Sequence, residues 1–117
     1  MRLNEIKYND AVPIDSYGPG FFRIGGKRFD GAVAAFSTGV KVWGGFDDTQ
    51  TILDQSDTLD VLFVGTGAEI AHLPSDFRTV LEDAGIGFES MASPAACRTY
   101  NVLLSEGRRV AGALIPV

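Results

Sequence analysis

Two runs of consecutive apolar residues constrain the fold of this chain more than any other feature. Residues 61–64 and 110–115 carry no charged or polar side chain, which is typical of strands that a sheet buries on both faces. Two segments with helical periodicity lie between these runs, and residues 86–90 alternate between them as a short strand. The predicted order after Asp60 is therefore β-α-β-α-β, which favours a largely parallel sheet with right-handed crossovers.

The first predicted helix covers residues 75–84. Asp76 lies in its first turn, where the helix dipole favours an acid, and Gly85 follows as the residue that ends it. The residues that share its apolar stripe are Phe77, Val80, Leu81 and Ala84.

The second predicted helix covers residues 94–106. Ser93 is expected to be its N-cap, Pro94 its first residue and Gly107 its end. The residues of its apolar stripe are Ala96, Cys97, Tyr100, Leu103 and Leu104.

The segment before Asp60 predicts antiparallel strands. Gly25-Gly26 suits a type I′ turn, because both positions need a positive φ, and the resulting hairpin sets Arg23 opposite Arg28. The hairpin face that we expect to be core carries Phe22, Ile24 and Phe29. These strands join the sheet at an edge or form a second layer, and the acidic residues 46–60 are expected to be a surface loop with one short helical turn.

Composition limits the classes of function. The chain fits a single domain, residues 1–117, and its net charge of −5 argues against binding nucleic acid or an anionic membrane surface. One cysteine and one histidine, Cys97 and His72, make neither a disulfide nor a zinc ligand set, so we expect no cofactor. Residues 1–8 lack the apolar core of a signal peptide and no run reaches about 20 apolar residues, so we expect a cytoplasmic protein and not an integral membrane protein.

The turn Gly65-Thr66-Gly67 follows a buried strand, which is where open α/β sheets place ligands. Its backbone N–H groups could cradle an anion. The glycine spacing of nucleotide-binding loops is missing, however, and no Lys-Ser or Lys-Thr pair follows. We favour a tight turn and keep a ligand loop as the alternative.

Two residues of the second predicted helix are candidate contacts. Cys97 lies near the helix N-terminus, which lowers a thiol pKa, but it also lies on the apolar stripe, where a thiol acts as a small hydrophobe. We favour the inert thiol. Asn101 is a poor residue for a helix interior, so it makes either a structural hydrogen bond to a neighbouring loop or a ligand contact. We favour the structural bond.

The pair of Arg23 and Arg28 is the other unusual feature. Like charges directly across a hairpin are destabilising unless they are solvated or a carboxylate such as Asp30 lies nearby. They could also form a surface for an acidic partner. Phe21 is predicted on the same face, and an aromatic residue among arginines is typical of interface cores.

Several stretches stand together in an order and spacing that resemble a known family: Gly18-Pro-Gly-Phe-Phe-Arg-Ile24, Val64-Gly-Thr-Gly67, residues 95–108 with Tyr100-Asn101 and Glu106-Gly107, and Ala113-Leu-Ile-Pro116. This family of small domains of unknown function occurs in archaea, bacteria and eukaryotes. It includes the mitochondrial complex I (NADH dehydrogenase) assembly factor and an adipogenesis-associated relative. The resemblance implies a three-layer α/β fold with a mixed central sheet, and it offers no catalytic residues to carry over.

The family resemblance and the small number of potentially catalytic residues indicate the same function. The assembly-factor branch works by binding proteins, and its mitochondrial members carry a targeting extension that we do not recognise here, which favours a bacterial or archaeal homologue. We expect a non-enzymatic protein-interaction module that assists the assembly of complex I or a similar membrane complex. The alternative is a small ligand-binding protein or enzyme, with a cleft at residues 65–67 and the N-terminus of the second helix, lined by Cys97 or Asn101.

Overall fold

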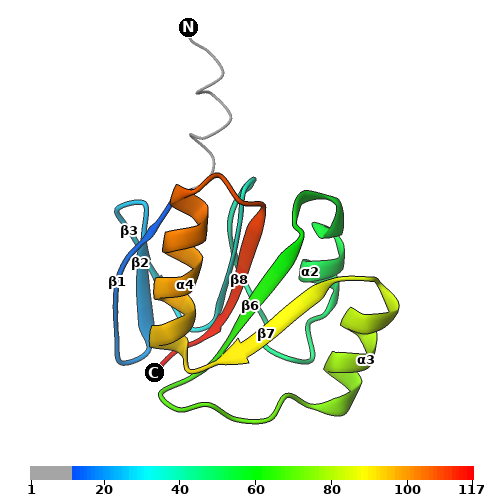
Figure 1. Cartoon of the computed structure of the whole chain (residues 1–117). Helices are drawn as coiled ribbons and strands as arrows, with labels where there is room; N and C mark the ends of the chain where they lie inside the picture. The colour runs from blue at the N-terminus through cyan, green and yellow to red at the C-terminus, as the bar shows by residue number, and fades with distance from the viewer. Residues whose placement is uncertain (1–11) are drawn as a thin grey trace, which may run out of the picture.

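The structure, a computed structural model that describes residues 12–117, contains two β-sheets (Figure 1). The smaller sheet has the strand order β1-β2-β3 and the larger one the order β5-β4-β8-β6-β7. The strands are β1 (Ile14–Gly18), β2 (Phe21–Ile24), β3 (Lys27–Asp30), β4 (Val33–Phe36), β5 (Gly39–Val42), β6 (Val61–Thr66), β7 (Gly87–Met91) and β8 (Val110–Ile115). The helical segments are α2 (Gln50–Leu53), the 3-10 turn η1 (Ser56–Thr58), α3 (Ser75–Asp83) and α4 (Ser93–Ser105). The expectation about residues 1–8 lies outside the described residues.

Strands β6 and β8 are both interior, as their two-sided apolar character predicts. β8 pairs with β6 in parallel and with β4 antiparallel, while β6 also pairs with β7 in parallel. The β4-β5 hairpin makes the sheet mixed. One detail of the prediction is wrong: β6 does not stop before Gly65 but continues through Thr66, because Gly65 and Thr66 keep their pairing with β8.

The predicted β2-β3 hairpin is confirmed in register and in turn. Phe22 lies opposite Phe29 and Arg23 opposite Arg28, and the turn glycines have φ values of 59° at Gly25 and 81° at Gly26. Pairing of β2 with β1 extends the hairpin into a second sheet. Of the two alternatives, the predicted hairpin therefore takes the second layer, in the sheet β1–β3, whereas the β4-β5 hairpin forms an edge of the central sheet.

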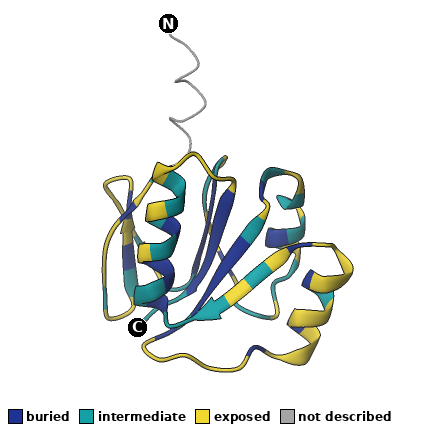
Figure 2. Ribbon diagram, in the orientation of Figure 1, coloured by how far each residue is buried: buried dark blue, intermediate teal, exposed yellow. Residues whose placement is uncertain are grey.

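Each face of the central sheet has its own hydrophobic core. α4 and the small sheet cover one face, and α2 and α3 cover the other, so the fold has three layers (Figure 1). Along β6, Leu62 and Val64 pack on the α3 side and Phe63 packs on the α4 side. Interior strands are consequently buried over most of their length, whereas β7 exposes part of its surface (Figure 2).

The helices lie where they are predicted, with corrections at single residues. Gly85 and Gly107 follow α3 and α4 with positive φ values of 73° and 80°, as expected of residues that end helices. Ala84 is exposed and does not belong to the buried stripe. Ser93 is not the N-cap, because α4 begins at Ser93 itself, and the serine hydroxyl bonds elsewhere.

The acidic segment 46–60 contains two short helical turns, α2 and η1, where one was predicted. It is not only surface, since Ile52 and Leu59 are buried in the core on the α3 side. None of the helices within residues 12–117 combines the length and the hydropathy needed to cross a membrane.

Candidate functional site

The outer face of the small sheet carries an aromatic-arginine stack. The Arg28 guanidinium carbon lies 4.0 Å from the centre of the Phe21 ring, and that of Arg23 lies 6.0 Å from it. Both arginines are exposed and Phe21 is half-buried. The ring lies against Gly18 of β1, where a Cβ would collide with it. The Phe21 ring thus packs against Gly18 and makes a cation–π contact with Arg28.

Asp30 relieves the repulsion between the two arginines. The Arg28 Nε atom donates to Asp30 Oδ1 at 2.9 Å, and the side chains of both residues are at least half exposed. The carboxylate predicted to lie nearby is therefore present. This exposed ion pair orients Arg28 over the ring more than it stabilises the fold.

Asn101 forms the structural bond that the sequence favoured. Its Oδ1 accepts from the Ile14 backbone N–H at 2.8 Å, and its Nδ2 donates to the Ile14 carbonyl at 2.9 Å. The partner is the first residue of β1 and not a loop. Both polar groups of the Asn101 side chain are committed to holding the small sheet against α4.

The segment Gly65-Thr66-Gly67 is packed against the start of α4. The Ser93 hydroxyl accepts from the Gly67 N–H at 2.9 Å and donates to the Ile115 carbonyl at 2.5 Å. The Gly67 carbonyl accepts from the Ser93 N–H at 2.7 Å, and Gly67 has a φ of 103°. Ser93 therefore occupies the Gly67 N–H that an anion would need. The sequence missed this role of Ser93 because it assigned the hydroxyl to a helix cap.

Cys97 is buried between α4 and the central sheet, with 4% of its surface exposed. Burial raises the pKa of its thiol to about 11, and the positive charge of Arg98 offsets only part of that rise. A thiol in this state carries little thiolate near neutral pH. Among residues 12–117, no group of three His, Cys, Asp or Glu side chains is placed to hold a metal ion.

The structure does not gather the candidate contacts into one site. Gly65 and Gly67 lie against Ser93 at the start of α4, whereas the Thr66 hydroxyl donates to the Glu69 carbonyl at 2.7 Å. Cys97 lies inside the core, and Asn101 holds β1. Arg23 and Arg28 are the pair that it does bring together, directly opposite each other on the small sheet.

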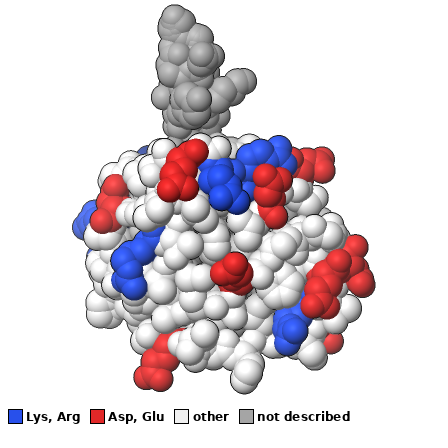
Figure 3. All heavy atoms as spheres, in the orientation of Figure 1, with Lys and Arg blue, Asp and Glu red and all other residues white. Residues whose placement is uncertain are grey.

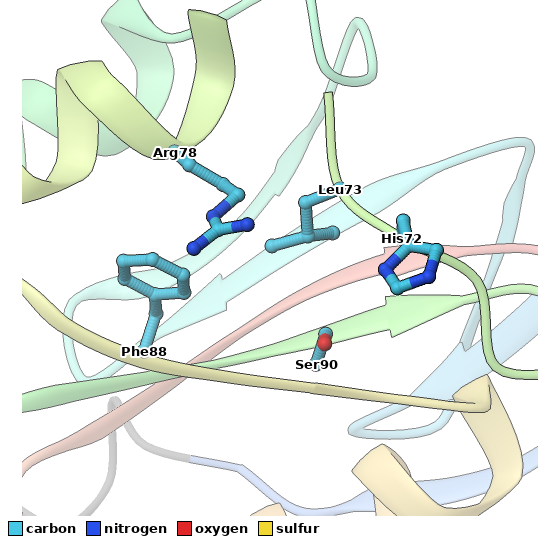
Figure 4. A pocket seen from close by; sticks show the side chains of 5 residues that line it. All are labelled: His72, Leu73, Arg78, Phe88 and Ser90. Atoms are coloured by element: carbon cyan, nitrogen blue, oxygen red, sulfur yellow. The ribbon is translucent and has the colours of Figure 1, made fainter. Parts of the chain in front are cut away.

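A groove beside β7 collects residues that the sequence did not connect. A pocket of about 240 Å³ is lined by His72, Leu73, Arg78, Phe88 and Ser90. Figure 4 shows the Arg78 guanidinium near the Phe88 ring on one side of the pocket and the His72 ring on the other, with Leu73 and Ser90 between them. The available signal was the two-residue period of β7, which puts Phe88 and Ser90 on one face; nothing in the sequence indicated that α3 and the preceding loop flank that face.

Charges of both signs are scattered over the face of the molecule seen in Figure 3, without a continuous basic field. The exposed apolar side chains are also dispersed among different elements: Tyr17, Val42, Ile70 and Val102. Small mixed surfaces, and not one large patch, are therefore the candidates for contact with other molecules.

Comparison with known families identifies the family of this chain. A family described as a protein of unknown function (DUF498/DUF598) matches residues 14–115, which is nearly the whole described chain. The chain belongs to this family. The resemblance noted in the sequence is thereby confirmed.

Relatives of this DUF498/DUF598 member include proteins of two kinds. An uncharacterized protein of Rhodobacter capsulatus is 44% identical over 117 residues, covering 100% of this chain and 94% of that protein. The human NADH dehydrogenase [ubiquinone] 1 alpha subcomplex assembly factor 3 is 34% identical over 114 residues, covering 91% of this chain. The chain spans only 61% of that human protein.

Solved structures of similar proteins share the fold. An outer membrane protein from Bartonella henselae has a TM-score of 0.82 at 35% identity, covering 92% of this chain and 97% of that one. A Bordetella pertussis protein with a Mth938-like domain has a TM-score of 0.74 at 29% identity, covering 99% of this chain and 92% of that one. These two solved chains therefore share the fold of this chain.

Proposed function

We propose that this protein acts by binding another protein, and that this binding assists the assembly of a membrane respiratory complex. The similarity to the NADH dehydrogenase assembly factor supports the assembly role. We also propose that it acts in the cytoplasm, because a single free cysteine is suited to a reducing compartment.

The observation that carries the binding proposal is the stack of Arg28 on Phe21. An aromatic ring packed beside two arginines combines the residue types that dominate protein interfaces. The stack faces outward, so a partner can cover it without unfolding any part of the small sheet. The ligand-binding alternative has less support, because Ser93 engages the Gly67 N–H.

The test is capture of partners by a variant in which both arginines are replaced, Arg23→Ala together with Arg28→Ala. The tagged protein is expressed in its native organism, cross-linked to its partners and analysed by quantitative mass spectrometry. We expect recovery of a specific partner to fall, since a hot-spot residue contributes about 1 kcal/mol or more to binding. A matched control replaces two other exposed cations, Lys41 and Arg108, and should recover the partner in full.

A second measurement tests the assembly role. In a strain without the gene, we expect less assembled NADH dehydrogenase in membranes, and restoration by the wild-type protein but not by the double arginine variant. If the strain assembles the complex normally, the assembly proposal is wrong. If the double variant captures every partner undiminished, the outer face of the small sheet is not the interface.

A further inference from the structure

We propose that the free edge of β7 binds an extended acidic peptide of a partner protein, which adds to the central sheet as a further strand. This inference rests on the proposed protein-binding role but concerns a different surface, on the other sheet. The acidic side chains of the peptide would bind in the groove of His72, Arg78 and Ser90.

The edge of the central sheet at β7 is open. β7 is the last strand in the order of the larger sheet, and within residues 12–117 it pairs with β6 alone. The N–H and C=O groups on the outer side of such a strand form a template for another strand. Peptide recognition by strand addition uses these backbone groups for affinity and flanking pockets for specificity.

A groove runs beside this edge. The pocket of His72, Leu73, Arg78, Phe88 and Ser90 adjoins a second pocket of about 300 Å³, which shares His72 and Ser90 with it and adds Ile70 and Ala71. Ile70 is 68% exposed, so the second pocket offers an apolar side chain. The first pocket offers the Arg78 guanidinium (Figure 4). Every second side chain of an added strand would point toward this groove.

Arg78 is the charged side chain that lines the two pockets, and it favours an acidic occupant. Arg78 is exposed, and none of the residues that line the two pockets is acidic. No ion pair involves Arg78 within the described part of the chain. The His72 ring and the Ser90 hydroxyl add hydrogen-bonding groups suited to a carboxylate.

Glu89 determines which face of the added strand carries its acidic residues. It lies between Phe88 and Ser90 in β7, so its side chain points to the opposite face, where an acidic residue would be repelled. Acidic residues of the peptide should therefore face Arg78. Glu89 also disfavours a second copy of this chain, because symmetric antiparallel pairing centred on it would place two Glu89 carboxylates opposite each other.

The experiment titrates synthetic peptides into the isotopically labelled protein and follows its backbone amides by NMR. The probe is a peptide of about nine residues in which aspartate alternates with threonine, and its control has lysine in place of each aspartate. We expect the aspartate peptide to shift the amide signals of Gly87–Met91 and to slow their hydrogen exchange. We expect Arg78→Glu to weaken this peptide at least about fivefold and to favour the lysine peptide, whereas Lys41→Glu, at an exposed position of β5, leaves binding unchanged.

Three results would overturn the proposal. The first is that neither peptide affects β7 at millimolar concentration, or that both bind equally well. The second is that acetate or phosphate alone gives the same shifts and the peptide adds no exchange protection, which indicates a small-anion site. The third is protection of β7 by self-association without peptide. A failure here is distinct from failure of the arginine variants in partner capture, because the two tests change different surfaces.

Discussion

Asn101 in α4 binds both backbone groups of Ile14, the first residue of β1, although 87 positions of sequence separate them. The two hydrogen bonds measure 2.8 Å and 2.9 Å and use the amide oxygen and the amide nitrogen of one side chain. They join the small sheet to the helix that covers the central sheet. The outward face of the small sheet, which carries the arginine-aromatic stack, thereby acquires a fixed position on the molecule.

Replacing Asn101 should therefore destabilise the whole fold. We expect Asn101→Ala to lower the free energy of unfolding by about 1–3 kcal/mol, because it leaves two part-buried backbone groups without their partner. Urea unfolding measures the change. The neighbour Val102 is 55% exposed, so Val102→Ala is the matched control and should cost about 0.5 kcal/mol or less. Equal costs for the two variants would contradict the role given to Asn101.

Gly65 is required by close packing and not by backbone conformation. A Cβ at this position would lie 2.6 Å from the Ser93 Oγ, 2.9 Å from the Ser93 Cα and 3.0 Å from Leu114 Cδ2. We expect Gly65→Ala to lower the free energy of unfolding by about 1–3 kcal/mol, since the start of α4 must move. Thermal unfolding measures the loss, reported as a lower Tm.

Gly112→Ala is the control for this prediction. Gly112 also lies in an interior strand of the same sheet, but its added Cβ would meet Tyr100 Cδ1 at 3.7 Å, an ordinary contact. We expect this variant to unfold close to the wild-type temperature. If Gly112→Ala proves as costly as Gly65→Ala, loss of glycine itself and not the collision with Ser93 explains the effect.

The sequence predicts the elements because their signals are local. Two glycines with positive φ specify the β2-β3 turn, and a two-residue turn leaves one register for the strands around it. Apolar runs on both faces likewise place β6 and β8 inside the sheet. Asn101 could be recognised as unusual, because asparagine has a low propensity for helix interiors.

The features that the sequence did not predict all depend on contacts between segments that are distant along the chain. Ser93 looks like a helix cap locally, but the folded chain brings Gly67 and Ile115 to its hydroxyl. Similarly, the groove beside β7 exists only because α3 and the loop before it pack next to that strand. Arg78 and Ser90 carry no mark in the sequence that distinguishes them from other exposed polar residues.

Tyr100 carries a buried hydroxyl that makes no hydrogen bond among the described residues, although the side chain is fully buried. A buried polar group without a partner costs roughly 1–3 kcal/mol. We expect Tyr100→Phe to raise the free energy of unfolding by about 1 kcal/mol, because the ring stays and the unpaired oxygen goes. Urea unfolding at neutral pH measures the gain. A clear loss of stability would show that the hydroxyl has a partner in solution.

Cys97 should react slowly in the native protein. Burial protects the sulfur and keeps the thiol protonated, so a thiol reagent at neutral pH needs a transient opening of the core. We expect labelling to be complete in urea and much slower in native buffer. Rapid stoichiometric labelling before unfolding would contradict the buried, inert thiol and would favour the cleft that was kept as an alternative.

The Cys97 thiol also makes the free energy of unfolding depend on pH in the alkaline range. Its pKa is about 11 in the folded chain against an ordinary value of 9.0, because burial disfavours the thiolate. Below pH 9 both states are protonated and the free energy of unfolding does not change through this group. Above pH 9 the unfolded chain loses the proton that the native chain retains, so unfolding becomes easier as the pH rises. Burial also raises the pKa of Tyr100, from 10.0 to about 12, and its contribution therefore begins later.

The interval from pH 9 to pH 10 isolates Cys97 for this measurement. We expect the wild-type protein to lose about 1 kcal/mol more than Cys97→Ala over that interval, as the difference between the two pKa values requires. Urea unfolding at both pH values gives the two slopes, and the smaller side chain of the variant lowers both of its values alike, so the slope is unaffected. Tyr100→Phe serves as the control, because it should keep the Cys97 slope below pH 10 and lose stability more slowly above it. Identical slopes for wild type and Cys97→Ala would mean that the thiolate is tolerated in the folded state, and the core around α4 would then be more open to water than its burial indicates.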